Sequence, residues 1–202
     1  LADLEGENFS KLEALNNANV VEQIRKFINL CKPTKVTIVT DSQDEIEYVR
    51  RLSLINGEEH KLRTEGHTVH FDGYYDQARK KEVTKYLVPK DSELDSKLNQ
   101  VEREKGLAEI ENLQKDAYKG RQMLVRFFCL GPVNSTFAIP CLQITDSAYV
   151  AHSEDLLYRK GYEEFKRQSK IGGFEFFKFR HATGEVDERM TSKNNHLNRV
   201  YM

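Results

Sequence analysis

The spacing of apolar residues along the chain predicts alternating helices and strands. Over residues 11–31 the spacing is helical, with one face turned inward. The residues on that face are Leu12, Leu15, Val20, Ile24, Phe27, Ile28 and Cys31. Pro33 ends this helix because proline cannot continue it. The β-branched stretch around Val36 and Ile38 then predicts a short strand.

A second helix is predicted to begin after Ser42. Glu45 follows three residues later, and this pair has the spacing of a capping box. Gly57 suits the end of the helix, because glycine readily takes the backbone conformation found there. The inner stripe of the helix consists of Ile46, Val49, Leu52 and Ile55. A strand candidate at 67–71 follows, so the order strand, helix, strand indicates a layered α/β arrangement.

The remainder of the chain continues this alternation. The predicted strands cover 84–88, 123–130, 137–144 and 174–181, and the predicted helices cover 102–117, 148–158 and 161–168. Pro140 interrupts its strand pattern, which favours an edge strand or a bulge. No repeat, linker or domain boundary is visible. We therefore predict an α/β fold, a mixed β-sheet flanked by helices on both faces, as a single domain over residues 1–202.

The composition excludes several classes of partner. The 202 residues carry a formal net charge of -1, with 39% hydrophobic and 31% charged residues. The bulk charge therefore gives no argument for a nucleic-acid partner. No stretch approaches the roughly 20 apolar residues that span a bilayer, and the N-terminus lacks the basic-then-apolar pattern of a signal peptide. We expect a cytoplasmic protein with no nucleic-acid partner and no membrane partner.

The cysteines and histidines do not predict a metal site. The chain has three widely spaced cysteines, Cys31, Cys129 and Cys141. Without a CxxC pair or a Cys/His cluster, buried reduced thiols are the expected state. His67 and His70 lie three apart in a strand-like segment, where odd spacing turns side chains to opposite faces. His152 and His181 are isolated, and we expect a hydrogen-bonded structural role for each.

One candidate for chemistry is the segment from Phe71 to Glu82. It has turn residues at Asp72-Gly73, two tyrosines and then a basic cluster that includes Arg79. The planar fork of a guanidinium can bind a small carboxylate or phosphate through two hydrogen bonds. Composition alone favours a solvated charged loop at this position, so both interpretations stay open.

The second candidate is the segment 131–155. Gly131-Pro132 and Thr145-Asp146-Ser147 each follow an apolar strand, and loops at strand ends in α/β layers often face a ligand. Asp146 or Ser147 could equally be the N-cap of the next helix, which is the simpler interpretation.

Four stretches of the chain, in order, resemble GTP-dependent phosphoenolpyruvate carboxykinases. They are Cys31-Lys32-Pro33 with Asp41-Ser42, Asp76-Gln77-Ala78-Arg79, Lys119-Gly120-Arg121 with the run from Met123 to Pro132, and the run from Ile144 to Val150. They are similar to the family's C-x-P and DGS opening, its D-x-A-R motif, its KGR-M-apolar-GP stretch and its LTDSPYV element. Residues 67–72 and 151–154 resemble the archaeal-type members in particular.

The resemblance implies a fold, a reaction and one site residue. The fold is that of the family's N-terminal domain, and the reaction converts oxaloacetate and GTP to phosphoenolpyruvate, GDP and carbon dioxide, a step of gluconeogenesis. Through the D-x-A-R motif, Arg79 is implied to contact the carboxylate or phosphate of oxaloacetate or phosphoenolpyruvate. Lys81 stands where the family often has glutamate, so a role for Glu82 stays open. Ala148 replaces a common proline.

The resemblance also implies what lies outside the chain. The chain begins at Leu1 and stops at Met202 within a strand-like pattern, so we expect both ends to be cut. The C-terminal domain of the same enzyme, which binds GTP with magnesium and holds manganese, would follow Met202. We therefore expect no catalytic, cofactor-binding or metal-binding residue within this chain, and no activity from it alone. The alternative is a stand-alone, non-catalytic α/β module that binds a small anion or a protein partner.

Overall fold

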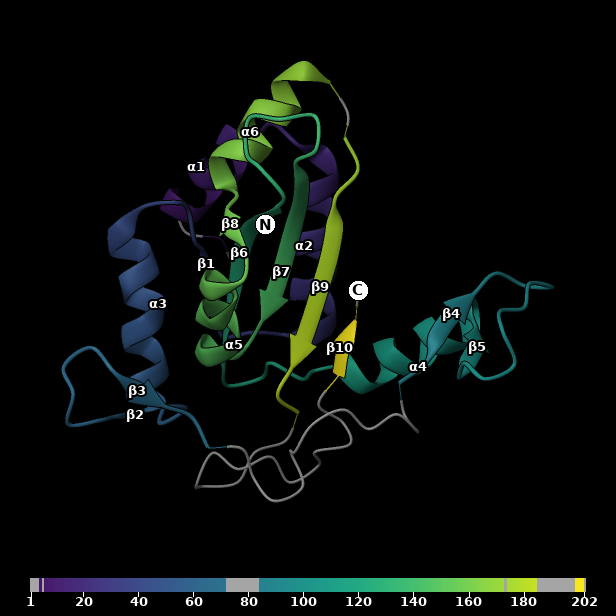
Figure 1. Cartoon of the computed structure of the whole chain (residues 1–202), viewed down its shortest axis with the longest axis horizontal. Helices are drawn as coiled ribbons and strands as arrows, with labels where there is room; N and C mark the ends of the chain where they lie inside the picture. The colour runs from purple at the N-terminus through teal and green to yellow at the C-terminus, as the bar shows by residue number, and fades with distance from the viewer. Residues whose placement is uncertain (1–3, 5, 72–83, 173, 185–198, 202) are drawn as a thin grey trace.

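The computed structural model describes residues 4, 6–71, 84–172, 174–184 and 199–201. Its centre is a mixed sheet in the order β1-β6-β7-β9-β10, and β8 pairs with β6 beyond the end of β1 (Figure 1). These strands are β1 (Lys35–Ile38), β6 (Gln122–Leu130), β7 (Ile139–Thr145), β8 (Arg159–Lys160), β9 (Phe177–Ala182) and β10 (Arg199–Tyr201). β1 is parallel to β6 and β7 is parallel to β9, whereas the other pairs are antiparallel. The predicted mixed sheet is confirmed.

Helices pack against both faces of this sheet. They are α1 (Gly6–Leu15), α2 (Ala18–Cys31), α3 (Gln43–Ile55), α5 (Ala148–Ser153), which continues into the 3-10 helix η1 (Glu154–Leu156), and α6 (Tyr162–Ile171). Met123, Val125 and Phe127 of β6 pack with α1, α2 and α6, and we call this side the α2 face. Leu124 points the other way and packs with α3 and α5, on the α5 face. Successive side chains of a strand alternate between faces, so one strand serves both layers.

The predicted helix over 11–31 is two helices, and that expectation was wrong. Asn16 has a positive φ of 49°, and Asn17 caps α2 by accepting a hydrogen bond from the Val20 amide at 3.1 Å. Asparagine tolerates the left-handed conformation and is a favoured N-cap, so the two asparagines start a new helix. The apolar spacing runs across the break because both helices bury their inner faces in the same core. The predicted stop before Pro33 is confirmed, since α2 ends at Cys31.

The strand candidate at 67–71 lies outside the main sheet. Only Thr68–Val69 (β3) are in a strand, and they pair with β2 (His60–Lys61) in a separate hairpin. The strand expected at 84–88 is β4 (Tyr86–Val88), which pairs in parallel with β5 (Gln100–Glu102) beside the helix α4 (Arg103–Gln114). Because these strands form two small sheets of their own, β1 pairs instead with β6, which lies far along the chain. Strands this short carry no pattern that assigns them to a sheet.

Pro140 lies in a central strand whose register with β6 is unbroken, so the expected edge strand or bulge was wrong. β7 runs between β6 and β9. Its pairing with β9 begins at Cys141, one residue after the proline. Pro140 therefore sits where only β6 is paired, and the ladder with β9 needs no N–H from it.

The second helix begins and ends where the sequence indicates. α3 starts directly after Ser42, and Gly57 has a positive φ of 72° just past its end. The capping box does not form, because the Ser42 side chain makes no capping bond and Glu45 accepts from the Thr40 amide at 2.6 Å. The helix expected at 148–158 is shorter and changes to a 3-10 turn at Glu154.

The three cysteines are buried free thiols, as predicted. Burial raises the pKa of Cys31 to about 12 and that of Cys141 to about 11, so both thiols stay protonated and unreactive near neutral pH. Among the described helices, none combines the length and the apolar character needed to cross a bilayer.

Candidate functional site

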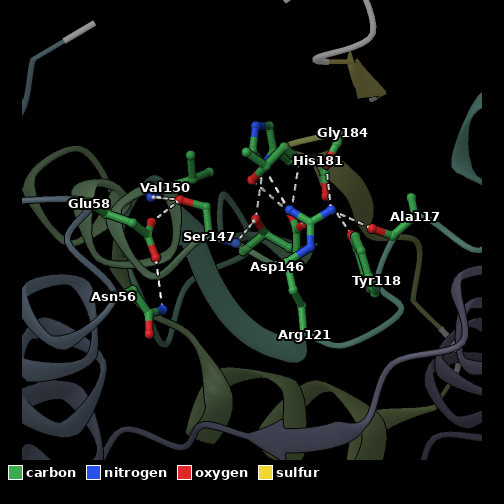
Figure 2. A network of polar contacts seen from close by, with 12 residues as sticks. Asn56, Glu58, Ala117, Tyr118, Arg121, Asp146, Ser147, Val150, His181 and Gly184 are labelled. Atoms are coloured by element: carbon green, nitrogen blue, oxygen red, sulfur yellow. Dashed lines mark hydrogen bonds and ion pairs between the residues drawn. The ribbon is translucent and has the colours of Figure 1, made fainter. Parts of the chain in front are cut away.

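The second candidate segment of the sequence forms a polar network at the end of β7. Thr145 ends this strand and Asp146 and Ser147 follow it, and the end of β9 and the turn after α3 lie beside them (Figure 2). The network contains two buried or half-buried acidic groups, Asp146 and Glu58, each with its own set of donors.

Asp146 is a buried anion held by three groups. Its side chain has no exposed surface, and its Oδ2 lies 2.8 Å from Nη1 of Arg121. The Thr183 amide and hydroxyl donate to Oδ1 at 2.9 and 3.1 Å. Burial raises the pKa of Asp146 above the ordinary aspartate value, and the Arg121 charge opposes this rise. The Thr183 hydrogen bonds therefore join the end of β7 to the residues after β9, and the ion pair joins it to Arg121, directly before β6.

Arg121, which directly precedes β6, joins a third segment to this network. Its Nη2 donates to the carbonyl oxygens of Ala117 at 2.6 Å and Gly184 at 2.5 Å, as Figure 2 shows. Next to it, the Tyr118 hydroxyl donates to the His181 carbonyl, and His181 Nδ1 lies 2.9 Å from the Thr145 hydroxyl. The expected structural role of His181 is confirmed. The Arg121 guanidinium and Oδ1 of Asp146 form hydrogen bonds within the fold, and Oδ2 of Asp146 faces Arg121, so we assign both residues to the scaffold.

Ser147 is the N-cap of α5, which confirms the simpler of the two interpretations. Its hydroxyl accepts from the Val150 amide at 3.1 Å and donates to Oε2 of Glu58 at 2.5 Å. The same Glu58 carboxylate accepts from the amides of Ala148 at 3.1 Å and Tyr149 at 2.9 Å. A negative charge at this position satisfies amides that a helix start leaves unpaired. Sequence reasoning missed Glu58, whose partners lie about 90 residues away.

The neighbouring Glu59 forms a second tie to α5. It is buried, and it accepts from the Ser53 hydroxyl, from Thr68 at 2.8 Å and from His152 Nε2 at 2.5 Å. Burial alone would raise the pKa of Glu59, but the hydrogen bonds from Ser53, His152 and Thr68 lower it overall. The predicted hydrogen-bonded role of His152 is confirmed.

His70 joins the start of the Arg79 segment to this network. Its Nδ1 lies 2.6 Å from the Glu58 carbonyl oxygen, and its ring stacks on Tyr149 with centroids 3.8 Å apart. His67 and His70 have different surroundings, since the carbonyl and amide of His67 bond within the loop to Leu62 and Thr64. Within the described ranges, no three His, Cys, Asp or Glu side chains could hold one metal ion together.

Arg79 and Glu82 lie outside the described residues. The last described residue before them is Phe71, directly after His70, and the first one after them is Thr84. On that second side, Lys85 pairs with Glu109 of α4 at 3.2 Å. The chain therefore leaves the scaffold beside α5 and returns to it beside α4.

These features define a class: an α/β domain whose polar network holds strand ends and the starts of loops together. The model of the phosphoenolpyruvate carboxykinase N-terminal domain family matches residues 22–202, and the chain belongs to this family. The resemblance seen in the sequence is thereby confirmed.

Curated relatives agree with this family. The GTP-dependent phosphoenolpyruvate carboxykinase of Thermococcus sibiricus is 52% identical over 199 residues, which cover 98% of this chain and 32% of the relative. That of Pyrococcus horikoshii is 51% identical over 196 residues, or 97% of this chain and 31% of the relative. The enzyme of Saccharolobus solfataricus is 42% identical over 177 residues, 88% of this chain and 28% of the relative. The chain spans about a third of the length of these relatives.

Proposed function

We propose that this chain is the N-terminal part of a GTP-dependent phosphoenolpyruvate carboxykinase that converts oxaloacetate and GTP to phosphoenolpyruvate, GDP and carbon dioxide. The observation that carries the proposal is the family match over residues 22–202, together with relatives of that name at about half identity over almost the whole chain. The proposed location is the cytoplasm.

Within this part of the enzyme, we assign the substrate contact to Arg79. Loss of carbon dioxide from oxaloacetate leaves an enolate, and the reacting groups carry negative charge throughout. A guanidinium can orient a carboxylate or phosphate through two parallel hydrogen bonds and balance its charge. The position of Arg79 in the D-x-A-R motif, nine residues after the anchored His70, supports this role.

The scaffold would contribute by fixing where the Arg79 segment begins. His70 is held by the Glu58 carbonyl and the Tyr149 ring, and the Glu58 carboxylate is bound to the start of α5. A group that must be held close to one geometry needs supporting residues that are themselves fixed. The network therefore suits a positioning role rather than a chemical step.

Metal and nucleotide binding belong to the proposed remainder of the enzyme. Manganese would neutralise charge on the reacting oxygens, and magnesium would accompany GTP. The described residues of this chain do not fit either metal, because no cluster of potential ligands is present among them. No step assigned to this chain therefore depends on a metal ligand of its own.

An activity assay tests the proposal. The complete enzyme, supplied with oxaloacetate, GTP and manganese, is expected to form phosphoenolpyruvate, because metal and nucleotide sites are then present. The 202-residue chain, assayed identically, is expected to form none, since phosphoryl transfer depends on both sites. Failure of the complete enzyme to form phosphoenolpyruvate would favour the stand-alone binding module, and turnover by the chain alone would show that it holds a catalytic centre.

A further inference from the structure

The α5 face carries exposed apolar side chains at the end of the sheet where β6 finishes and β7 and β9 begin. We call these residues the apolar band; they are Leu130 (44% exposed), Ile139 (38%), Leu156 (88%), Leu157 (73%) and Phe177 (55%). On the α2 face of the same strands, the apolar side chains are buried. On the α5 face the exposed side chains lie at the strand ends, because further along the strands Phe128 and Cys141 are each 1% exposed and the Tyr158 ring packs against Phe128.

Strand register shows that the band is continuous. Leu130 is opposite Ile139, and Phe177 is opposite Cys141, two residues further along β7. Paired side chains point to one face of a sheet, and diagonal neighbours remain within reach of each other. On the other edge of β6, Arg159 of β8 is opposite Cys129, so the residues preceding Arg159 approach Leu130. Leu156, the last residue of η1, and Leu157 lie three and two residues before Arg159, next to this end of β6.

The 3-10 turn η1 is polar on the inside and apolar on the outside. Leu156 and Leu157 project into solvent, whereas Oε2 of Glu154 is buried without a hydrogen-bond donor. On β7, Gln143 is 2% exposed and its Oε1 also lacks a donor. A surface turn ordinarily shows the reverse pattern, and buried acceptors without donors are costly. This arrangement suits a turn whose outer side is covered by further protein.

We propose that the apolar band is the surface on which the C-terminal remainder of the same polypeptide packs. This inference rests on the proposed function, because the named relatives are about three times as long as the part that matches this chain. The remainder is thus large enough to cover the band. The face that carries the band also carries, at the other end of β7, the start of α5, which anchors the entry to the Arg79 segment. Exposed apolar patches of this kind mark protein contacts.

Thiol labelling of the complete enzyme tests the packing. The three cysteines of this part of the enzyme are buried, so the labelling of Phe177→Cys and of Ile55→Cys is each taken as the gain over the unmodified enzyme. Ile55 is the matched control, because it is 79% exposed at the end of α3, outside the band. We expect maleimide to label Phe177→Cys at least about 100-fold more slowly in the native enzyme than in the unfolded one. Ile55→Cys should be labelled within a few-fold of its unfolded rate.

Two results would overturn the proposal. One is equal labelling rates for Phe177→Cys and Ile55→Cys in the native enzyme. The other is protection of Phe177→Cys that disappears on dilution, which would assign the band to a second copy of the protein. Phosphoenolpyruvate formation is measured on the same samples, so an active enzyme with a reactive Phe177→Cys would refute the packing and leave the proposed function intact.

Discussion

Along β6, the side chains on the α2 face are Met123, Val125 and Phe127, whereas those on the α5 face include Leu124 and Arg126. The first group lies in a continuous apolar core. On the second face, the buried Arg126 guanidinium binds Asp155 and the Ala151 carbonyl. One strand thus supports an apolar layer that is complete and a second layer that is partly polar and partly uncovered.

This difference separates the α2 face, which stabilises the domain, from the α5 face, which we connect with function. The apolar residues of the α2 face lie in a core that the described part of the chain itself buries. The α5 face carries the Glu58 and Glu59 ties, the anchor of His70 and the apolar band. The described residues that we connect with the Arg79 segment or with the rest of the enzyme, His70 and the apolar band, lie on this face or at its edge.

The largest stability effect is expected from the α2 face. Phe165 of α6 is fully buried against Phe127, so Phe165→Ala should lower the opening free energy of β6 amides by about 4 kcal/mol. Phe177→Ala, in the apolar band, is the matched control and should cost about 0.5 kcal/mol or less within this domain. Hydrogen exchange of β6 amides measures both values. Equal losses would remove the distinction between the two faces.

A smaller loss is expected from the polar edge of the α5 face. Asp146→Asn keeps an acceptor for Thr183 but leaves the half-buried Arg121 without a counter-charge. The expected loss is about 3 kcal/mol, because breaking one side of a buried ion pair is strongly destabilising. Amide exchange near Gly184 and Ala117 reports it.

Asp116→Asn provides the control for that change. Asp116 pairs with Lys119 at the surface, at 3.1 Å, and exposed pairs contribute less than about 1 kcal/mol. A loss from Asp146→Asn no greater than that of the control would mean that the buried pair does not hold the strand ends together.

The α2 face could be predicted from the sequence, whereas most of the α5 face could not. The apolar run over 123–130 and the helical spacing over 11–31 are local patterns, and both led to buried elements. They could not show the break at Asn16, because both helices face one core. They also could not show that β1 pairs with β6, since that contact joins residues 87 positions apart and short intervening strands carry no register of their own.

The polar network was only partly predictable. Ser147 has the N-cap signal of its residue type, and the structure confirms it. Glu58 has no local signal, because its carboxylate binds amides that follow a different strand. The role of Arg79 came from the family motif alone, since the charge pattern around it equally describes a solvated loop.

The most direct test of the account is the kinetics of Arg79 variants in the complete enzyme. Arg79→Ala is expected to lower kcat/KM for phosphoenolpyruvate and for oxaloacetate by about 100-fold, because a bidentate contact to the substrate is lost. Arg79→Lys should recover only part of this loss, since an ammonium lacks the planar fork. Lys80→Ala, the adjacent cation, should stay within a few-fold of the unmodified enzyme. Unchanged KM and kcat in Arg79→Ala would contradict the assignment of the substrate contact to this domain.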